Sequence, residues 1–188
     1  MPQAYEVTVV PLSPLEALWG SGAMVESTPE GAVRCRLRDL ADLMNEELDK
    51  PAIRKAIDGL AKSMMLLPQC EAHLGHIFCD GLYGRKWSCA KGNFIVTEIW
   101  KVQNISSLIK GKIVIATENG FETMEAGSFF VTEPGTQRVI FILEDATFTT
   151  VHPNPTNERD TDKLLESLTT VTKYDKVPGS IGLIEELL

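Results

Sequence analysis

Six side chains in the middle of the chain could together form a small binding site. Glu98 could ligate a metal ion or assist a proton transfer, and His152 could act as a general base. Arg138 carries a fixed positive charge that suits an anion, and Trp100 offers a flat aromatic wall for stacking. The candidate ligand-pocket residues are Tyr83, Glu98, Trp100, Asn104, Arg138 and His152.

No catalytic set can be assigned to these residues. A histidine base needs an acid that orients it, and the sequence alone pairs no acidic side chain with His152. The chain also lacks the fingerprints of phosphate-binding loops, of dinucleotide-binding folds, of serine hydrolases and of zinc metalloproteases. We therefore expect neither a catalytic residue nor a cofactor.

Histidine and cysteine are too sparse to indicate a metal centre. The 188 residues include three histidines and four cysteines, and no two cysteines have the CxxC spacing of a zinc or redox site. His73 and His76 are separated by a turn-like segment with Gly75, which favours a hydrogen-bonding or surface role over metal ligation. The cysteines are interpreted as buried, reduced thiols of a cytosolic protein: Cys35, Cys70, Cys79 and Cys89.

The charge balance excludes some classes of partner. The chain has 18 Lys+Arg and 26 Asp+Glu, a formal net charge of -8, whereas proteins that grip nucleic acid need clustered basic residues. The N-terminus has neither a basic start nor an apolar core, and the longest apolar run, Val139–Leu143, is too short for a membrane span. We expect no nucleic acid as the main ligand and no membrane association.

Proline, glycine and apolar patterns divide the chain into four zones. Residues 1–35 are interpreted as an extended arm, 36–69 as a helical segment, 70–156 as a β-barrel and 157–188 as a helix with an apolar docking tail. Pro51 favours a break followed by the first turn of a second helix, so the helical segment is a helical pair. An arm and an apolar tail of this kind need a surface on which to lie, in the same chain or in another subunit.

Apolar residues at intervals of three and four predict the helices. The apolar face of the first helix comprises Leu37, Leu40, Leu43, Met44 and Leu48, and that of the second comprises Ile53, Ile57, Leu60, Met64 and Met65. Basic and acidic residues are nearly balanced from Arg34 to Lys55, which argues against a DNA-reading helix. A further helix is expected over Glu158–Leu168, with Asn157 as its N-cap.

Short β-prone stretches separated by glycines follow from residue 73 to residue 153. Their spacing, about 8–12 residues, is typical of a sandwich or small barrel of antiparallel strands. The predicted strands include Leu82–Cys89, Phe94–Lys101, Lys112–Thr117, Ser128–Thr132, Arg138–Leu143 and Thr147–His152. Glu118-Asn119-Gly120 predicts a tight turn after one of them. The fold class is therefore mainly β with flanking helices.

The spacing of residues 92–111 resembles the first motif of the cupin family. In that motif a glycine, a His-x-His pair, a glutamate and a second glycine recur at fixed gaps. Gly92 and Gly111 stand at the glycine places of this chain. The metal-ligand places hold Glu98, Trp100 and Asn104 instead. The gaps match the cupin motif, but the ligand set is degenerate.

A second stretch is similar to the second cupin motif. Gly127 leads after five residues to a Glu-Pro-Gly turn that ends at Gly135. Arg138 then stands at the place of the ligand histidine, and Ile142 at that of the asparagine. The resemblance implies a double-stranded β-helix, or jelly-roll barrel. It also implies that Arg138 occupies the place of the metal, where a divalent cation would be repelled.

Two roles are open for the altered ligand places. Alternation along one strand would put Phe94, Val96, Glu98 and Trp100 on one face, which in cupins points into the barrel. Glu98 and Arg138 could then form a buried ion pair that replaces the lost metal centre. The alternative is a small-ligand pocket, in which Arg138 binds an anion and Trp100 stacks on the ligand.

The resemblance extends to a narrower group, the single-domain cupin-like (RmlC-like) proteins of tailed bacteriophages. Residues 76–85, 134–139 and 149–153 are similar to that group, and the likeness covers about residues 65 to 168. It favours a non-enzymatic virion-associated or assembly protein, with a homo-oligomer and other virion proteins as partners. Its location would be the virion or the host cytoplasm.

Two other functions remain open. The first is a metal-free sugar-type isomerase or epimerase that would use His152 together with Tyr83. The second is a protein that sequesters a small ligand against host defence, with Arg138 holding a phosphate or carboxylate. An isomerase needs a polar, open barrel mouth where Glu98, Arg138 and His152 converge.

Overall fold

The structure is a computed structural model that describes residues 7–8, 35–37, 39–40, 42–43, 50–64 and 73–170. Most of the predicted arm, the predicted docking tail from residue 171 on, and Met44, Leu48 and Met65 of the predicted helical faces lie outside the described residues. Among the described residues, no helix is long and apolar enough to cross a membrane.

The described elements are mostly strands. Residues 35–37, 39–40 and 42–43 are helical, ahead of the helix α2. The elements are β1 (Val7–Thr8), α2 (Lys50–Met64), β2 (His73–Cys79), β3 (Gly81–Cys89), β4 (Phe94–Val96), β5 (Ile99–Trp100), β6 (Asn104–Lys110), β7 (Lys112–Thr117), β8 (Gly120–Glu125), β9 (Phe129–Thr132), β10 (Val139–Ile142), β11 (Ala146–Asn154), α3 (Thr161–Leu168) and β12 (Thr169–Thr170).

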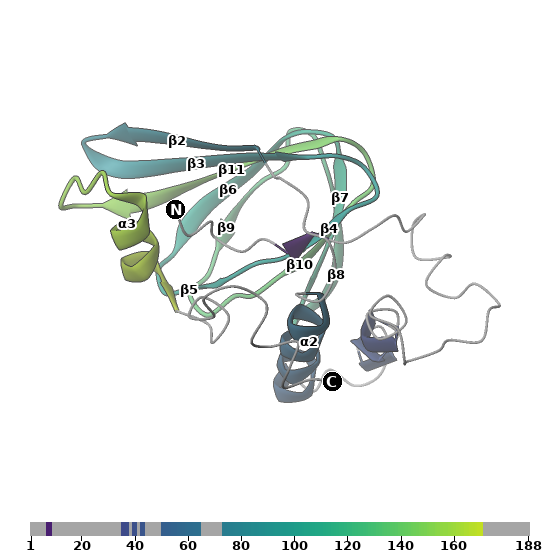
Figure 1. The fold of residues 1–188 in the computed structure, drawn as a ribbon. Helices are drawn as coiled ribbons and strands as arrows, with labels where there is room; N and C mark the ends of the chain where they lie inside the picture. Colours follow the sequence, from purple (N-terminus) through teal and green to yellow (C-terminus); the bar gives the residue numbers. More distant parts are fainter. Residues whose placement is uncertain are drawn as a thin grey trace.

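Two five-stranded antiparallel sheets form the body of the protein (Figure 1). Sheet A has the order β1-β4-β10-β7-β8, and sheet B has the order β2-β3-β11-β6-β9. The edge strands β1 and β2 can be left out, and the other eight strands of these two sheets renumbered 1 to 8 along the chain. Sheet A then has the order 2-7-4-5 and sheet B the order 1-8-3-6. This is the jelly-roll arrangement, so the predicted mainly β, cupin-type barrel with flanking helices is confirmed.

An apolar core fills one half of the space between the sheets. The strands alternate, so that Trp87 and Phe148 of sheet B point inward toward Ile113 and Ile140 of sheet A. The rings of Trp87 and Phe148 stack with centroids 5.2 Å apart. This core holds the two sheets together at one end of the barrel, and the other end is lined differently.

A second core lies on the outer side of sheet A, where α2 packs (Figure 1). At their described positions the predicted apolar faces are confirmed: Leu43 is partly buried against the core, and the other positions are buried, namely Leu37, Leu40, Ile53, Ile57, Leu60 and Met64. They pack against Val96, Ala116 and Val139, which alternate with the inward residues of sheet A. Sheet A is therefore apolar on both faces, which explains the continuous apolar runs in its strands.

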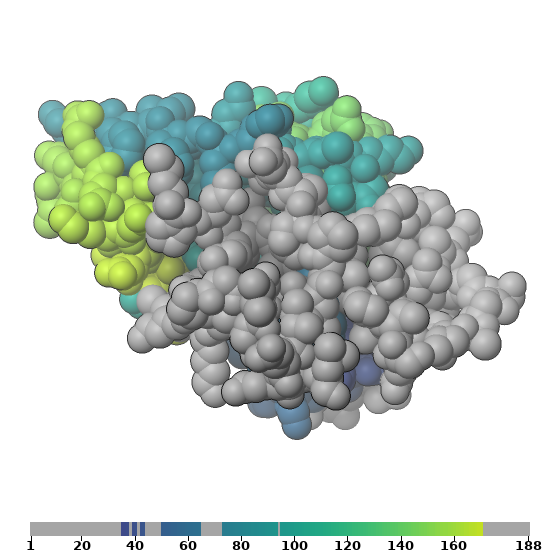
Figure 2. Space-filling view, in the orientation of Figure 1, coloured from purple at the N-terminus to yellow at the C-terminus, as the bar shows by residue number. Residues whose placement is uncertain are grey.

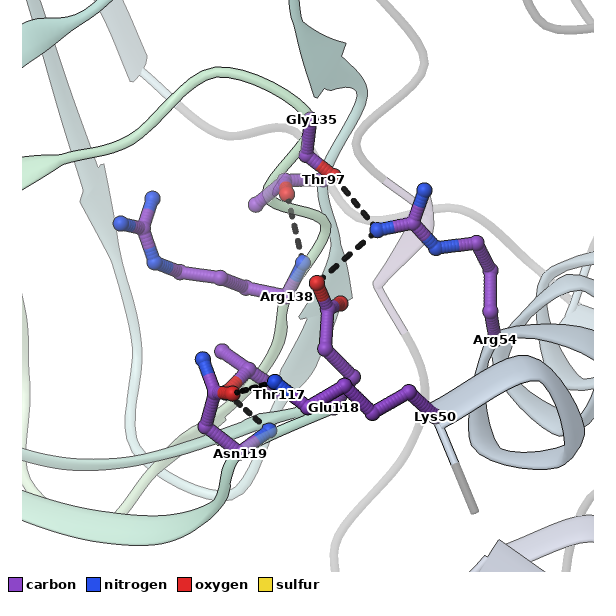
Figure 3. A network of polar contacts seen from close by, with 8 residues as sticks. All are labelled: Lys50, Arg54, Thr97, Thr117, Glu118, Asn119, Gly135 and Arg138. Atoms are coloured by element: carbon purple, nitrogen blue, oxygen red, sulfur yellow. Dashed lines mark hydrogen bonds and ion pairs between the residues drawn. The ribbon is translucent and has the colours of Figure 1, made fainter. Parts of the chain in front are cut away.

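Polar contacts fasten α2 to the loops at one edge of sheet A (Figure 3). The Arg54 guanidinium donates to the Glu118 carboxylate at 3.0 Å and to the Gly135 carbonyl at 2.7 Å. The Lys50 ammonium donates to the Asn119 side chain at 2.7 Å. These contacts join the helix to the β7–β8 turn and to the Pro-Gly turn before β10.

Arg54→Met is expected to lower the free energy of unfolding by about 1 kcal/mol, because it removes two partly buried hydrogen bonds but keeps the apolar stem. The measurement is chemical denaturation monitored by tryptophan fluorescence. Lys55→Met on the exposed side of α2 is the matched control and should change stability by less than about 0.5 kcal/mol. Equal losses in the two variants would contradict a fastening role for Arg54.

Within residues 73–170, four strands lie where the sequence did not predict one: β2, β6, β8 and the two-residue strand β12. The β2 strand contains His73 and His76, so these histidines lie on a strand and share no helical face. The β6 and β8 strands carry polar residues at many positions, which conceals their alternation. The predicted tight turn at Glu118-Asn119 is confirmed, since Thr117 pairs directly with Gly120.

The long strand predicted for Phe94–Lys101 is wrong, because it is broken in two. The backbone leaves the sheet at Thr97 and Glu98, between β4 and β5. Thr97 exchanges hydrogen bonds with Arg138: its amide donates to the Arg138 carbonyl at 2.9 Å, and its hydroxyl accepts from the Arg138 amide at 3.0 Å (Figure 3). As a result Ile95 points inward and Val96 packs under α2, opposite to the predicted alternation.

The C-terminal helix begins later than predicted. The N-cap of α3 is Asp160, whose carboxylate accepts from the amides of Asp162 and Lys163. Asn157 adopts a positive φ of 52° and accepts a hydrogen bond from the Gly81 amide at 2.8 Å. The predicted cap at Asn157 is therefore wrong, because that side chain holds the β2–β3 turn instead.

The predicted burial of all cysteines is also only partly correct. Cys89 is buried, whereas Cys79 is exposed at the end of β2, next to the β2–β3 turn. Cys35 is partly buried, and Cys70 lies outside the described residues. The β2–β3 hairpin and α3 together form one end of the molecule (Figure 2).

Candidate site in the barrel interior

The interior of the barrel changes from apolar to polar along the strands of sheet B. The register of β3, β11, β6 and β9 aligns inward side chains in successive layers across the sheet. From the apolar end the layers contain Trp87, Phe148 and Leu108, then Arg85, Thr150 and Ser106, then Tyr83, His152, Asn104 and Thr132. The last two layers are buried and form the candidate site.

Polar side chains connect β6, β9 and Arg138, the residue before β10, inside this end. The Ser106 hydroxyl donates to the Asn104 side-chain oxygen at 3.1 Å and lies 2.8 Å from the Thr132 hydroxyl. The Arg138 guanidinium donates to the same Thr132 hydroxyl. The network therefore joins two of the predicted candidate residues, Asn104 and Arg138, through a threonine that the sequence did not single out.

Arg138 is a buried cation at the mouth of the barrel. Its side chain is 5 % exposed, and its guanidinium carbon lies 5.4 Å from the centroid of the Phe130 ring. Burial lowers the pKa of Arg138 to about 10, an effect opposed by the negative charge of Glu122. The side chain thus stays charged near neutral pH. Among the described residues it forms no ion pair with Glu98, so the predicted Glu98–Arg138 pair is not found.

His152 is completely buried between two aromatic rings. Its ring stacks on Trp100 with centroids 4.1 Å apart and lies 5.9 Å from the Tyr83 ring. Nε2 lies 2.7 Å from the Thr150 hydroxyl, and Nδ1 is buried with no hydrogen-bond partner among the described residues. Burial, reinforced by the positive charge of Arg85, lowers the pKa of His152 to about 3. The imidazole is therefore neutral at physiological pH.

Tyr83 and Trp100 connect the site to α3, which covers this end of the barrel (Figure 1). Both aromatic residues pack with Leu164 and Leu168 of the helix, and the short strand β12 pairs with β5 beside Trp100. The Tyr83 hydroxyl lies 2.8 Å from Nδ1 of His76, which agrees with the hydrogen-bonding role predicted for that histidine.

The structure brings five of the six predicted candidates together as buried side chains: Tyr83, Trp100, Asn104, Arg138 and His152. Glu98 is only half-buried in the break between β4 and β5. Sequence reasoning missed Arg85, Ser106, Thr132 and Thr150. Arg85 could have been found, because it lies two residues from Tyr83 on a predicted strand and so shares its face.

The donor set does not fit the metal that the cupin fold implies. Among the described residues, no three His, Cys, Asp or Glu side chains gather closely enough to hold an ion. The polar end instead contains the cations Arg85 and Arg138, a histidine that resists protonation, and hydroxyl and amide groups. Such an interior favours negative charge over a divalent cation. The buried amide nitrogen of Asn104, which has no hydrogen-bond partner among the described residues, adds one donor.

No protein-family model matches the chain, and a search of the curated proteins finds no match. Solved structures with a similar fold include a cupin-2 domain protein from Shewanella frigidimarina, 15% identical, with a TM-score of 0.37 over 47% of this chain and 86% of that one. An RmlC-like cupin family protein with a double-stranded β-helix fold from Methanocaldococcus jannaschii is 12% identical, with a TM-score of 0.40 over 46% and 84% of the two chains.

An oxalate decarboxylase from Bacillus subtilis is 14% identical, with a TM-score of 0.43 over 64% of this chain and 34% of that one. Proteins similar to this chain thus include an enzyme as well as proteins described by their fold alone. The glycines at the motif places Gly92, Gly111, Gly127 and Gly135 all have positive φ. Together with the jelly-roll order of the two sheets, this gives the chain a cupin-type double-stranded β-helix fold.

Proposed function

We propose that this chain is a non-enzymatic jelly-roll barrel that acts through protein contacts, as a virion-associated or assembly protein of a bacteriophage. The main support for the proposal is the set of side chains that occupies the end of the barrel where a cupin binds its metal. Arg138, Trp100 and His152 fill that end as buried side chains that pack on one another or on the barrel wall. The likeness of residues 76–85, 134–139 and 149–153 to phage proteins supports the assignment to a phage.

The state of His152 argues against an isomerase or epimerase. An efficient general base has a pKa near the working pH, whereas burial lowers the pKa of His152 to about 3. Its Nε2 contacts the Thr150 hydroxyl, and neither ring nitrogen contacts a carboxylate among the described residues. A sugar-type substrate would also have to displace the Trp100 ring that stacks on the imidazole.

Binding of a small anion is the second candidate function, and the donors of the interior favour it. Arg138 is charged and buried, and the amide nitrogen of Asn104 has no hydrogen-bond partner among the described residues. A phosphate or carboxylate beside them would accept from both groups. This chemistry fits the role of a protein that sequesters a ligand.

Three measurements test these proposals. Mass spectrometry of purified phage particles should detect this chain at many copies per particle. Native mass spectrometry of the free protein should give a whole multiple of the polypeptide mass, with no added ligand mass. Metal analysis of protein purified without chelators should find no stoichiometric iron, manganese, nickel or zinc, because Arg138 repels a cation at the metal place. Arg138→Met is the control for an anion: it should leave the native mass unchanged apart from the substitution.

Absence from the particles would contradict the virion role, and a stoichiometric metal would contradict the interpretation of the degenerate motifs. A retained anion in the wild-type protein that is lost in Arg138→Met would favour the sequestering function instead. If the protein assists assembly and then leaves the particle, it should be absent from purified particles but present in assembly complexes isolated from infected cells.

A further inference from the structure

The outer face of sheet B carries a row of apolar residues that crosses all five strands. The strand register aligns Ile77 with Gly84, Gly84 with Val151, Val151 with Ile105, and Ile105 with Val131. Ile77 is 64 % exposed and Val131 54 % exposed. These positions alternate with the inward residues of the candidate site, so their side chains point away from the barrel. We call the five aligned residues the apolar row.

The surroundings of the apolar row are also poor in charge. Leu82, Ile109 and Phe129 are exposed on the same strands, and Phe129 is 72 % exposed. The charged side chains at outward positions of the described strands of this sheet are Lys86 and, at the end of β6, Lys110. The water-facing side of an antiparallel sheet is normally polar, whereas the cores of protein interfaces are depleted of charge. This composition is typical of an interface.

The face is also complementary to itself. β11 is its central strand, with β6 and β9 on one side and β2 and β3 on the other. The β6–β9 side carries Ile105 and Val131, whereas the β2–β3 side has Gly84 next to β11 and the exposed Ile77 on the edge strand β2. A two-fold axis along β11 would place Ile105 of each copy over Gly84 of the other and Val151 against its own counterpart. At the edges of the face it would place Ile77 of each copy against Val131 of the other, an apolar pair.

The size of the face agrees with a dimer. Five strands about 4.8 Å apart, with about seven residues each at a rise of about 3.4 Å, cover roughly 24 Å by 24 Å. That footprint is roughly 600 Å² before the relief of the side chains is counted, close to the roughly 800 Å² that each partner buries in a standard interface. A second copy of the sheet can therefore cover the whole face.

We infer that the outer face of sheet B is the interface of a two-fold symmetric homodimer, in which the two sheets pack face to face with β11 on the axis. The inference rests on the proposed function and deepens it, because it names the partner surface of a protein that acts through contacts. The occupant of the face is a second copy of this chain, whose own apolar row and glycine position match it across the axis.

Val151→Glu in the full chain tests the interface, because it would place two carboxylates against each other at the axis. Sedimentation velocity over a range of protein concentrations should show a dimer for the wild type and a dissociation constant about 100-fold higher, or more, for Val151→Glu. Phe121→Glu is the matched control, since Phe121 is an exposed apolar residue of β8 in sheet A. It should leave the dimer intact.

A cross-linking experiment tests the position of the axis and does not depend on dissociation. In a Cys79→Ser background, Val151→Cys should be joined to itself by a bis-maleimide that spans about 10 Å, the distance between packed sheets. Phe121→Cys in the same background should give only the level of cross-linking seen without an added cysteine. Circular dichroism of each variant verifies that it is folded.

A wild-type monomer at every concentration would overturn the inference, and so would equal dissociation constants for Val151→Glu and Phe121→Glu. A monomer that dimerises only after residues 171–188 are removed would assign the face to the chain's own C-terminal segment and would also overturn it. These failures differ from failure of the proposed function, because particle mass spectrometry does not depend on the dimer. If the protein dimerises but is absent from particles, the inference about the interface stands and only the proposed virion role fails.

Discussion

Gly111→Ala is expected to lower the free energy of unfolding by about 3 kcal/mol or more. Gly111 joins β6 to β7 with a φ of +87°, a left-handed conformation that residues with a Cβ adopt only at a cost. A Cβ at this position would also lie 2.5 Å from the Asp145 carbonyl oxygen and 2.9 Å from the Cα of Ala146. Both contacts are backbone atoms at the start of β11, so no side chain can rotate away to relieve them.

Gly135→Ala is the control that separates the two causes. Gly135 has a similar φ of +82°, but nothing lies within 4 Å of the position that its Cβ would occupy. It should lose only the conformational part, about 1–2 kcal/mol. Urea denaturation of the two variants and the wild type gives the comparison. Equal losses at the two positions would mean that the β11 backbone yields to the new methyl group, contrary to the expectation for Gly111.

These glycines explain why the barrel could be predicted from the sequence. Each glycine of the two cupin-like motifs lies in a turn with positive φ, where the chain passes from one strand to the next. Whether a turn requires glycine depends only on the local backbone, and the spacing between such glycines can be read directly from the sequence. The pattern therefore marks the strand connections even though the metal ligands between them have changed.

The orientation of single side chains was harder to predict where a strand is interrupted. Alternation through Phe94–Lys101 placed Val96 inside the barrel, but Val96 packs under α2 and Ile95 lies inside. The break begins at Thr97, which exchanges hydrogen bonds with Arg138, 41 residues away along the chain. Trp100 reaches the interior because of that break. A periodic pattern in one segment contains no information about a partner from another segment.

The same limit applies to the helix α3. Asn157 and Asp160 are both suitable N-cap residues, and the local sequence does not decide between them. Asn157 contacts the Gly81 amide of the β2–β3 turn instead, so the helix begins after Asp160. The apolar positions of α2 were predictable because they follow a helical period, but their packing partner, the outer side of sheet A, was not.

The candidate site itself was predicted by position more than by chemistry. The spacing of the two cupin-like motifs predicts Trp100, Asn104 and Arg138 as site residues by their place in the sequence, and the structure buries all three. What they contact could not be predicted, because Thr132 and Thr150 have no distinctive chemistry until the fold places them beside Arg138 and His152.

Acidification below pH 7 is expected to destabilise the protein through His152. Burial and the positive charge of Arg85 lower its pKa to about 3 in the folded state, whereas the unfolded chain has the usual pKa of about 6.5. Between these values the unfolded state binds a proton that the folded state does not bind, so the free energy of unfolding falls as the pH falls. The loss should be about 2 kcal/mol by pH 5 and should increase further toward pH 3.

His152→Gln provides the comparison, because glutamine can contact the Thr150 hydroxyl but cannot be protonated. The variant should be less stable than the wild type at pH 7, since it loses the stacking on Trp100. The difference between the two proteins should shrink as the pH is lowered from 7 to 5. His76, whose pKa is also lowered by burial and by Arg85, is present in both proteins, so its contribution cancels. Parallel stability curves for the two proteins would mean that His152 can take up a proton inside the barrel. The interior would then tolerate a further positive charge beside Arg85, and the preference for negative charge inferred above would be wrong.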